Sequence, residues 1–451
     1  MACWFISASS PTGNDRRIEL AGIDLWLFAR TDQAFVYPSE VDLGRFKYAL
    51  SRTLSTWPLI AGRFLVLDDE HYVIEMSDNE IPVTFVENTT LSTWPIDLNL
   101  VSELHNNRLE TFIDGVDIIK LYRGSADEPL VRLKLTRLVQ SGEWILGVSW
   151  AHILGDAMAF LNFLNTISCF YQNLEPIEPL PVFERRLWRE NETDKSLLPI
   201  MKHLNDAKPL EEMFQVYSSW QNTHDQLSVR FSSNQLAKLR ELAGGSKVTI
   251  QDSLSAYLIL TLNNHCYQND EQRRILRANT VMNFRGVSDS IAPVGLVSNA
   301  IFMMLSENFD DPLSLSSIAT TIRHSIHRAR DPKFLEPWLA TADGLMRKIV
   351  RENLLANWEQ FPNEVVINSN YRYDWASLVD FGHTDKCRLY TAWTGPCYFR
   401  VFRLNPVYDG TQWLPRDRNG AEVAFLIEKD MKQKFIDAYR KDIEDNFANI
   451  K

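Results

Sequence analysis

A proline-rich stretch near the middle of the chain restricts how the chain can fold. Between Asn173 and Glu211 the sequence carries five prolines, mixed charges and little periodicity. Because proline lacks an amide hydrogen and has a fixed φ angle, prolines at this density exclude a long helix or a central strand. The stretch therefore predicts a crossover linker, residues 173–211, that joins an N-terminal half, residues 1–172, to a C-terminal half, residues 212–451.

Both halves mix helical and strand patterns. Alternating residues predict strands, among them a hairpin formed by residues 130–139 and 144–150. The composition is 45% apolar, as in globular proteins with substantial cores. Each half is therefore predicted to be of the α/β class with a mixed sheet. Apolar residues at helical spacing predict helices over residues 43–57, 157–172, 312–330, 338–357 and 431–447.

Charge and cysteine content exclude several classes of protein. Lys and Arg number 47 against 58 Asp and Glu, so the formal net charge is −11, which disfavours binding to nucleic acid or an anionic membrane. We find no apolar run long enough for a membrane span and no signal-peptide core. The five cysteines are scattered without zinc-binding spacing. We therefore expect a cytoplasmic protein with reduced thiols and no metal site.

His152 is the candidate for acid–base chemistry. It follows a strongly apolar predicted strand, where a side chain can project from a rigid sheet edge into a cleft. An imidazole with a pKa near 6.5 can take up and return a proton around neutrality. Position alone fits a structural histidine more often than a catalytic one. Asp156, four residues later, could orient the imidazole or pair with an arginine and hold the loop.

Other catalytic templates do not occur. The sequence has no GxSxG elbow, no GxxxxGK[ST] loop, no HExxH and no GxGxxG. The segment Gly244–Lys247 lacks the spacing of a phosphate loop and predicts a helix end followed by a turn.

Six segments follow the pattern of a known family in order along the chain. The segment His152–Asp156 matches HxxxD, and Trp57–Arg63 is close to YPLAGR. In these segments the chain resembles the BAHD acyltransferases, the coenzyme-A-dependent enzymes of plant and fungal specialised metabolism, and we expect a fungal-type member. The other matching segments are Leu20–Asp24 (L-x-x-L-D), Asn283–Arg285 with Pro293 and Ser298–Asn299 (D-x-R…P…G-N), Asp380–Thr384 (DFGWG) and Val423–Phe435 (the closing strand and helix).

The resemblance implies a fold and a reaction. The fold would be two chloramphenicol-acetyltransferase-like domains, each a mixed β-sheet flanked by helices, joined by a long crossover loop. The reaction would move an acyl group, most simply acetyl, from a coenzyme A thioester to a hydroxyl or amine of a specialised metabolite. His152 would act as general base for direct attack in a ternary complex. Acyl-CoA would be a co-substrate of a monomeric enzyme that holds no cofactor tightly.

The resemblance also implies roles for further residues. Asp156 would pair with Arg285 and be structural, and Asp380 with Gly382 would hold the loop of the DFGWG segment, where Asp380 could compete for Arg285. The candidate oxyanion donors are Asn368 and Ser369 on the strand before that loop. Coenzyme phosphates need a local cationic site in an acidic protein, and the candidates for coenzyme binding are Lys247, the helix start at Thr249, and Ser298 and Asn299.

Two other functions stay open. Condensation domains of peptide synthetases resemble this fold but carry HHxxxDG, whereas Ala151 occupies the first of those positions here. A repurposed scaffold or a non-catalytic ligand-binding protein is the other alternative. The altered loop at Asp380 allows it, because His383 and Thr384 stand where the family has Trp and Gly.

Overall fold

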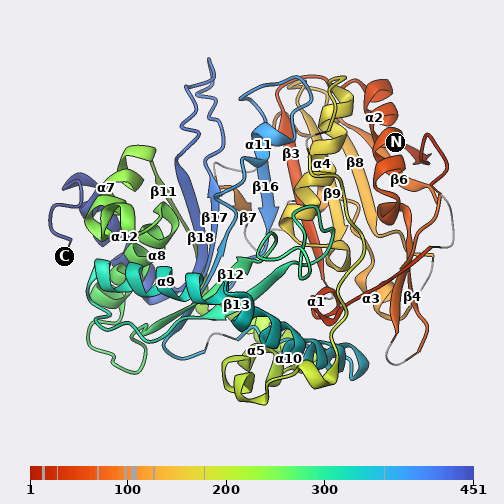
Figure 1. Ribbon diagram of the computed structural model, residues 1–451. Coiled ribbons are helices and arrows are strands. Elements are labelled where there is room, and N and C mark those ends of the chain that lie inside the picture. Colours follow the sequence, from red (N-terminus) through yellow and green to blue (C-terminus); the bar gives the residue numbers. More distant parts are fainter. Residues whose placement is uncertain are drawn as a thin grey trace.

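Two large mixed sheets dominate the computed structural model, which describes residues 1–12, 16–27, 29–68, 71–95, 99–102, 109–124, 127–176, 178–359 and 361–450. The described strands form a seven-stranded, a six-stranded, a three-stranded and a two-stranded sheet. Figure 1 shows the two large sheets side by side, with helices on their outer faces. The α/β class and the mixed sheets predicted from the sequence are confirmed.

The seven-stranded sheet is built mainly from the first half of the chain. Helices α2 (Leu43–Thr56) and α4 (Ala157–Tyr171) pack on it, and their apolar residues share one core with its strands. Short helix α3 spans Ile118–Tyr122. The strand order is β1 (Ala2–Ile6), β6 (Ile81–Asn88), β8 (Val131–Leu138), β9 (Trp144–Ala151), β3 (Arg30–Tyr37), β16 (Arg388–Ala392) and β7 (Val101–Ser102). A small sheet of β2 (Arg17–Glu19), β5 (Tyr72–Glu75) and β4 (Arg63–Val66) accompanies it.

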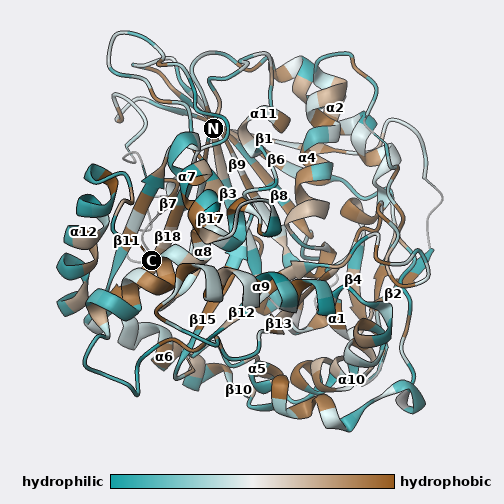
Figure 2. Cartoon of the chain, turned by 60° about the vertical axis from the view of Figure 1, so that its left-hand side comes forward, coloured by the Kyte–Doolittle hydropathy of each residue, from teal (hydrophilic) through white to brown (hydrophobic). Residues whose placement is uncertain are grey.

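The six-stranded sheet is built from the second half. Its strand order is β11 (His224–Phe231), β18 (Ala421–Glu428), β17 (Tyr398–Arg403), β15 (Glu364–Ser369), β12 (Arg277–Asn283) and β13 (Ile301–Leu305). One core joins it to α7 (Ser233–Ala243), α8 (Ile250–Thr261), α9 (Leu315–Ala329) and α12 (Lys429–Glu444). Figure 2 shows apolar residues in the strands and hydrophilic ones on the outer side of α12. A third core packs α10 (Pro332–Arg351) against α1 (Gly22–Leu25).

The predicted elements are largely confirmed, with one clear displacement. Helices α2 and α4 and the hairpin β8–β9 lie where the patterns placed them. Helix α10 was predicted over 338–357 but spans Pro332–Arg351. The prediction was wrong because it missed a start signal: Asp331 caps the helix and Pro332 occupies its first turn.

Strand β16 departs from the predicted division of the chain. It belongs by sequence to residues 212–451 but pairs with β3 in the sheet of the first half. The helix before it, α11 (Trp375–Leu378), also packs there, because Trp375, Val379 and Leu389 are buried in the first core. Hydroxyl Oη of Tyr37 donates to the carbonyl of Val379 over 3.0 Å. Apolar pattern alone says that a strand is buried but does not say in which sheet.

The crossover is partly structured. Residues 173–211 include two 3-10 turns, helix α5 (Lys202–Asn205) and the start of helix α6 (Leu210–Thr223). Strand β10 (Lys208–Pro209) pairs with β14 (Leu354–Leu355) of the second half. These elements attach the end of the linker to the C-terminal half.

Three further features concern the part of the chain that the structure describes. No helix there is long and apolar enough to cross a membrane. None of the five cysteines forms a disulfide bond. No group of three His, Cys, Asp or Glu side chains within those ranges is arranged to hold a metal ion.

Candidate active site

A large cavity lies between the two sheets. Its volume is about 1340 Å³, and it is lined by residues of both halves and of α6. Strand β3 of the first sheet and strands β12, β15 and β17 of the second contribute to its wall. His152 and Asp156 lie on the same wall, so the predicted catalytic segment faces the cavity.

The main chain around His152 places its imidazole at the end of a buried strand. All residues of β9 are buried, and the amide of His152 donates to the carbonyl of Ala29 over 2.8 Å. Gly155 follows with a φ of +152°, and a Cβ there would lie 2.7 Å from Cβ of Ala159 and 3.0 Å from the carbonyl oxygen of Ser298. Only glycine fits this turn, which lets the chain reverse from β9 into α4 without moving the histidine.

Asn299 sets the tautomer of the imidazole. Its Nδ2 donates to the carbonyl of His152 over 2.7 Å, and its Oδ1 lies 2.9 Å from Nδ1 of His152. A carbonyl only accepts, so the amide nitrogen must face it and the amide oxygen must face the ring. Nδ1 of His152 therefore carries the proton, and Nε2 is left with a free lone pair.

Asp24 holds Asn299 in place. It is completely buried in α1, and its Oδ1 accepts from the amide of Asn299 over 2.9 Å and from the hydroxyl of Ser298 over 2.7 Å. Its Oδ2 accepts from Nε of Arg185 over 2.8 Å, inside the crossover. This network connects the first half, the crossover and the second half directly behind the imidazole.

Burial keeps His152 neutral. Loss of solvent is the largest effect and lowers the pKa of His152 below its ordinary value of 6.5. A hydrogen bond to its own main chain, the Asn299 bond and the charges of Asp156 and Asp24 act in the opposite direction. At neutral pH the imidazole is thus unprotonated on Nε2, while two carboxylates nearby favour the charged form that a proton transfer would create.

Asp156 faces away from the imidazole. Its Oδ1 accepts from the amides of Met158 and Ala159 over 3.0 and 3.2 Å and so caps α4. Its Oδ2 lies 2.6 Å from Nη1 of Arg285, and both side chains are at most 3% exposed. Of the two interpretations open for Asp156, the geometry favours a structural carboxylate paired with Arg285.

The sequence matches the family model described as the Transferase family over residues 3–382. The chain belongs to this family, that of the BAHD acyltransferases. No curated protein sequence matches it significantly.

Solved structures share the fold of this acyltransferase. Vinorine synthase is 15% identical, with a TM-score of 0.64 over 96% of this chain and 95% of that one. F. graminearum TRI101 complexed with coenzyme A and T-2 mycotoxin is 14% identical, with a TM-score of 0.59 over 95% and 98%. The condensation domain from monacolin K polyketide synthase MokA has a TM-score of 0.59 at 12% identity over 96% and 98%. At these identities the likeness concerns the fold alone.

Asp380 does not compete for Arg285. Its Oδ1 accepts from the amide of His383 over 2.6 Å, and its Oδ2 accepts from the hydroxyl of Thr384 over 3.1 Å. Gly382, between Asp380 and His383, has a φ of +92°, which favours glycine. The carboxylate therefore closes its own turn, and the suggested competition is wrong because both of its oxygens are engaged locally.

The two predicted oxyanion donors line the cavity but differ in what they contact. Nδ2 of Asn368 donates to Oη of Tyr398 over 2.7 Å, whereas the hydroxyl of Ser369 donates to Oε1 of Gln251 over 2.5 Å. Asn368 has a second amide hydrogen, while the single proton of Ser369 is already used.

The residues predicted for coenzyme binding separate into two sets. Thr249 caps α8 and lines the cavity, and Lys247 is exposed two residues before it without being part of the lining. Ser298 and Asn299 are at most 1% exposed and belong to the network behind His152. Their assignment to the coenzyme is corrected, because their polar side-chain atoms serve Asp24 and His152.

Sequence reasoning missed several residues of the site. Asp24 was noted only as part of a motif, and Arg185 was not noticed, because their pairing spans 161 positions. The cationic side chains of the cavity wall were also missed, since they come from separate elements. These are Arg30, Arg123, Arg240, Arg323, Arg372 and Arg400.

The buried pair Asp156–Arg285 yields a stability prediction. Asp156→Asn keeps an oxygen to cap α4 but leaves the guanidinium of Arg285 buried without a counter-charge. We expect a loss of about 3–5 kcal/mol in the free energy of unfolding, measured by urea denaturation. The double variant Asp156→Asn with Arg285→Met removes both charges and should recover part of this loss. A loss below about 1 kcal/mol in the single variant would contradict the assignment.

The tautomer and the pKa of His152 can be measured by NMR on histidine-labelled protein, with His152→Gln to assign the signals. We expect the Nδ1-protonated tautomer and a pKa below 6.5, so that the ring charges only as the pH falls below that value. Asn299→Asp places a carboxylate against Nδ1 and should raise the pKa. An Nε2-protonated ring, or a pKa unmoved by Asn299→Asp, would refute this geometry.

Proposed function

We propose that this acyltransferase moves an acyl group from a coenzyme A thioester to a hydroxyl or amine of a specialised metabolite, with His152 as general base. The observation that carries the proposal is the imidazole held by Asn299, with its free Nε2 on the wall of a cavity shared by both halves. The complex of F. graminearum TRI101 with coenzyme A and T-2 mycotoxin supports a coenzyme and a small acceptor in this fold. Acetyl is the first acyl group to test.

The proposed reaction transfers one proton and one acyl group. Nε2 of His152 takes the proton of the acceptor as the acceptor oxygen or nitrogen attacks the thioester carbonyl. The tetrahedral intermediate collapses, the carbon–sulfur bond breaks, and the imidazolium returns its proton to the thiolate of coenzyme A. Asp156 and Asp24 stabilise the transient imidazolium through their charge, without touching the reacting atoms. No covalent acyl-enzyme is required.

The developing oxyanion needs a donor inside the cavity. We assign this role first to Asn368, whose second Nδ2 hydrogen is available beside its bond to Tyr398. Ser369 would have to give up its bond to Gln251 to take part.

Coenzyme phosphates would bind where the N-terminus of α8 meets cationic side chains. Thr249 begins this helix, and Lys247 lies exposed just before it. Arg323 and Arg372 line the cavity, and burial, aided by these two charges, lowers the pKa of Arg330. The positive charges of Arg323 and Arg372 thus both act on Arg330, and a region with several positive charges favours a multivalent anion.

The general-base role is tested with free-thiol release from acetyl-CoA and longer acyl-CoAs, using a panel of hydroxylated and amino metabolites. His152→Ala should lower the rate by about 100-fold or more, because a positioned base contributes that much. His324→Ala, an exposed histidine on α9, is the matched control and should retain full activity. Full activity in His152→Ala would exclude the general base, and failure to bind coenzyme A in calorimetry would favour a repurposed scaffold.

The phosphate site is tested by the KM for acetyl-CoA. Lys247→Ala and Arg372→Ala should each raise this KM by about tenfold, and the effect should shrink at high salt. Lys238→Ala serves as control, because this lysine on α7 pairs with Glu241 over 3.1 Å. An unchanged KM in both variants would place the phosphates elsewhere.

A further inference from the structure

Within the described part of the chain, the cavity wall contains a buried arginine without an acidic partner. Arg400 on β17 is 9% exposed and lines the cavity. Its Nη1 donates to the carbonyls of Ala392 and Trp393 over 2.7 Å each, but its Nε is buried without a hydrogen-bond partner. No carboxylate of the described residues forms an ion pair with it.

This arrangement differs from the other buried arginines of the site. Arg285 is paired with Asp156 and Arg185 with Asp24. Burial lowers the pKa of Arg400 to about 10, so the guanidinium stays charged at neutral pH. A buried charge is costly unless it is paired, and this cost falls when an anionic ligand enters the cavity.

The acidic side chains of the cavity wall do not supply that partner. Asp32 pairs with Arg30 over 2.9 Å, and Asp156 pairs with Arg285. Oδ2 of Asp252 accepts from the amide of Thr249 over 2.8 Å at the start of α8 and lies 3.6 Å from Arg323. The remaining acid of the wall, Glu211, is exposed at the start of α6.

A second donor lies on the same face of the sheet. Tyr398 is two residues before Arg400 on β17, so both side chains point the same way. Oη of Tyr398 accepts from Asn368, and burial raises the pKa of Tyr398, so its own proton is retained and can be donated. Asn368 is also the register partner of Arg400 on β15. Arg400 and Tyr398 therefore offer two donors suited to a carboxylate.

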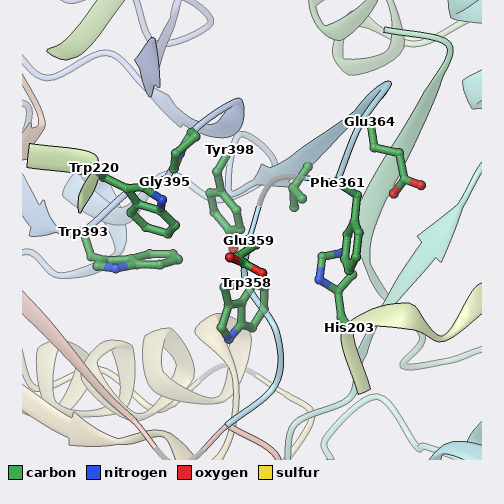
Figure 3. A pocket seen from close by; sticks show the side chains of 11 residues that line it. His203, Trp220, Trp358, Glu359, Phe361, Glu364, Trp393, Gly395 and Tyr398 are labelled. Atoms are coloured by element: carbon green, nitrogen blue, oxygen red, sulfur yellow. The ribbon is translucent and has the colours of Figure 1, made fainter. Parts of the chain in front are cut away.

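An aromatic wall adjoins these donors. Ring centroids of Trp393 and Tyr398 are 5.2 Å apart, and Trp358 lies 6.3 and 6.2 Å from them. Figure 3 shows these three rings converging around a second, much smaller pocket that shares them with the large cavity. Flat apolar groups pack well against such a wall.

We propose that Arg400 and Tyr398 form a subsite for a carboxylate, with the aromatic wall taking the apolar part of the same molecule. The role of this subsite rests on the proposed function, because the carboxylate belongs either to the acceptor or to the far end of a dicarboxylic acyl group. Binding of the carboxylate itself does not depend on catalysis.

Binding is tested by calorimetry with benzoate and its neutral match, benzamide. Wild-type protein should bind benzoate more tightly, and Arg400→Met should weaken benzoate roughly 100-fold with little effect on benzamide. Arg403→Met is the matched control, because Arg403 on the same strand also donates to main-chain carbonyls but lies outside the cavity lining. Tyr398→Phe leaves the guanidinium in place and should weaken the binding of benzoate several-fold. This variant replaces Arg400→Met in the test if Arg400→Met does not fold. Equal binding of benzoate and benzamide to wild type, or benzoate binding unchanged in these variants, would overturn the subsite.

The source of the carboxylate is decided by transfer assays. With acetyl-CoA, 4-hydroxyphenylacetate is compared with its methyl ester; with a neutral phenol as acceptor, succinyl-CoA is compared with butyryl-CoA. An Arg400-dependent preference for the acid acceptor assigns the subsite to the acceptor, and one for succinyl-CoA assigns it to the acyl group. If no pair and no member of the metabolite panel supports transfer and coenzyme A does not bind, the proposed function fails, while the benzoate titrations still decide whether the subsite exists.

Discussion

The active site depends on the hydrogen bonds that the buried carboxylate of Asp24 accepts. This carboxylate accepts hydrogen bonds from the crossover through Arg185 and from the second half through Ser298 and Asn299, while it belongs to the first half. Since Asn299 in turn fixes the ring of His152, the imidazole is oriented only when all three parts of the chain are assembled. A site built in this way is organised by folding and needs no ligand to set its tautomer.

The pair Asp156–Arg285 supports the same loop from the other side. Arg285 donates to the carbonyls of Leu296 and Ser298, next to Asn299, and binds Asp156 at the start of α4. The two aspartates thus act at a distance on the histidine: they hold its surroundings and favour its charged form, while burial keeps it neutral at rest. This balance suits a base that must accept a proton and then return it.

Elements and local motifs were largely predictable, because periodicity and capping are encoded over a few neighbouring residues. The hairpin leading to His152 and the cap at Thr249 are examples. The partner of Asp156 was reached through the resemblance. Ser298 and Asn299 were assigned to the coenzyme, because a motif shows that residues matter without showing which way their side chains point. Strand β16 lies by sequence in the second half but joins the sheet of the first, and local patterns did not predict this because the sheet that a strand joins depends on long-range packing.

The sequence by itself determined the family, the two-part α/β architecture and the identity of His152 as the candidate base, because these depend on residue type and local order. Tertiary structure alone decided which nitrogen of His152 is free, that Asp156 faces away from it, and that Arg400 in the cavity wall has no ion-pair partner among the described residues. Each of these facts depends on burial and on hydrogen-bond or ion-pair partners that lie far apart in the chain. No local sequence pattern shows the distance or the direction between such groups.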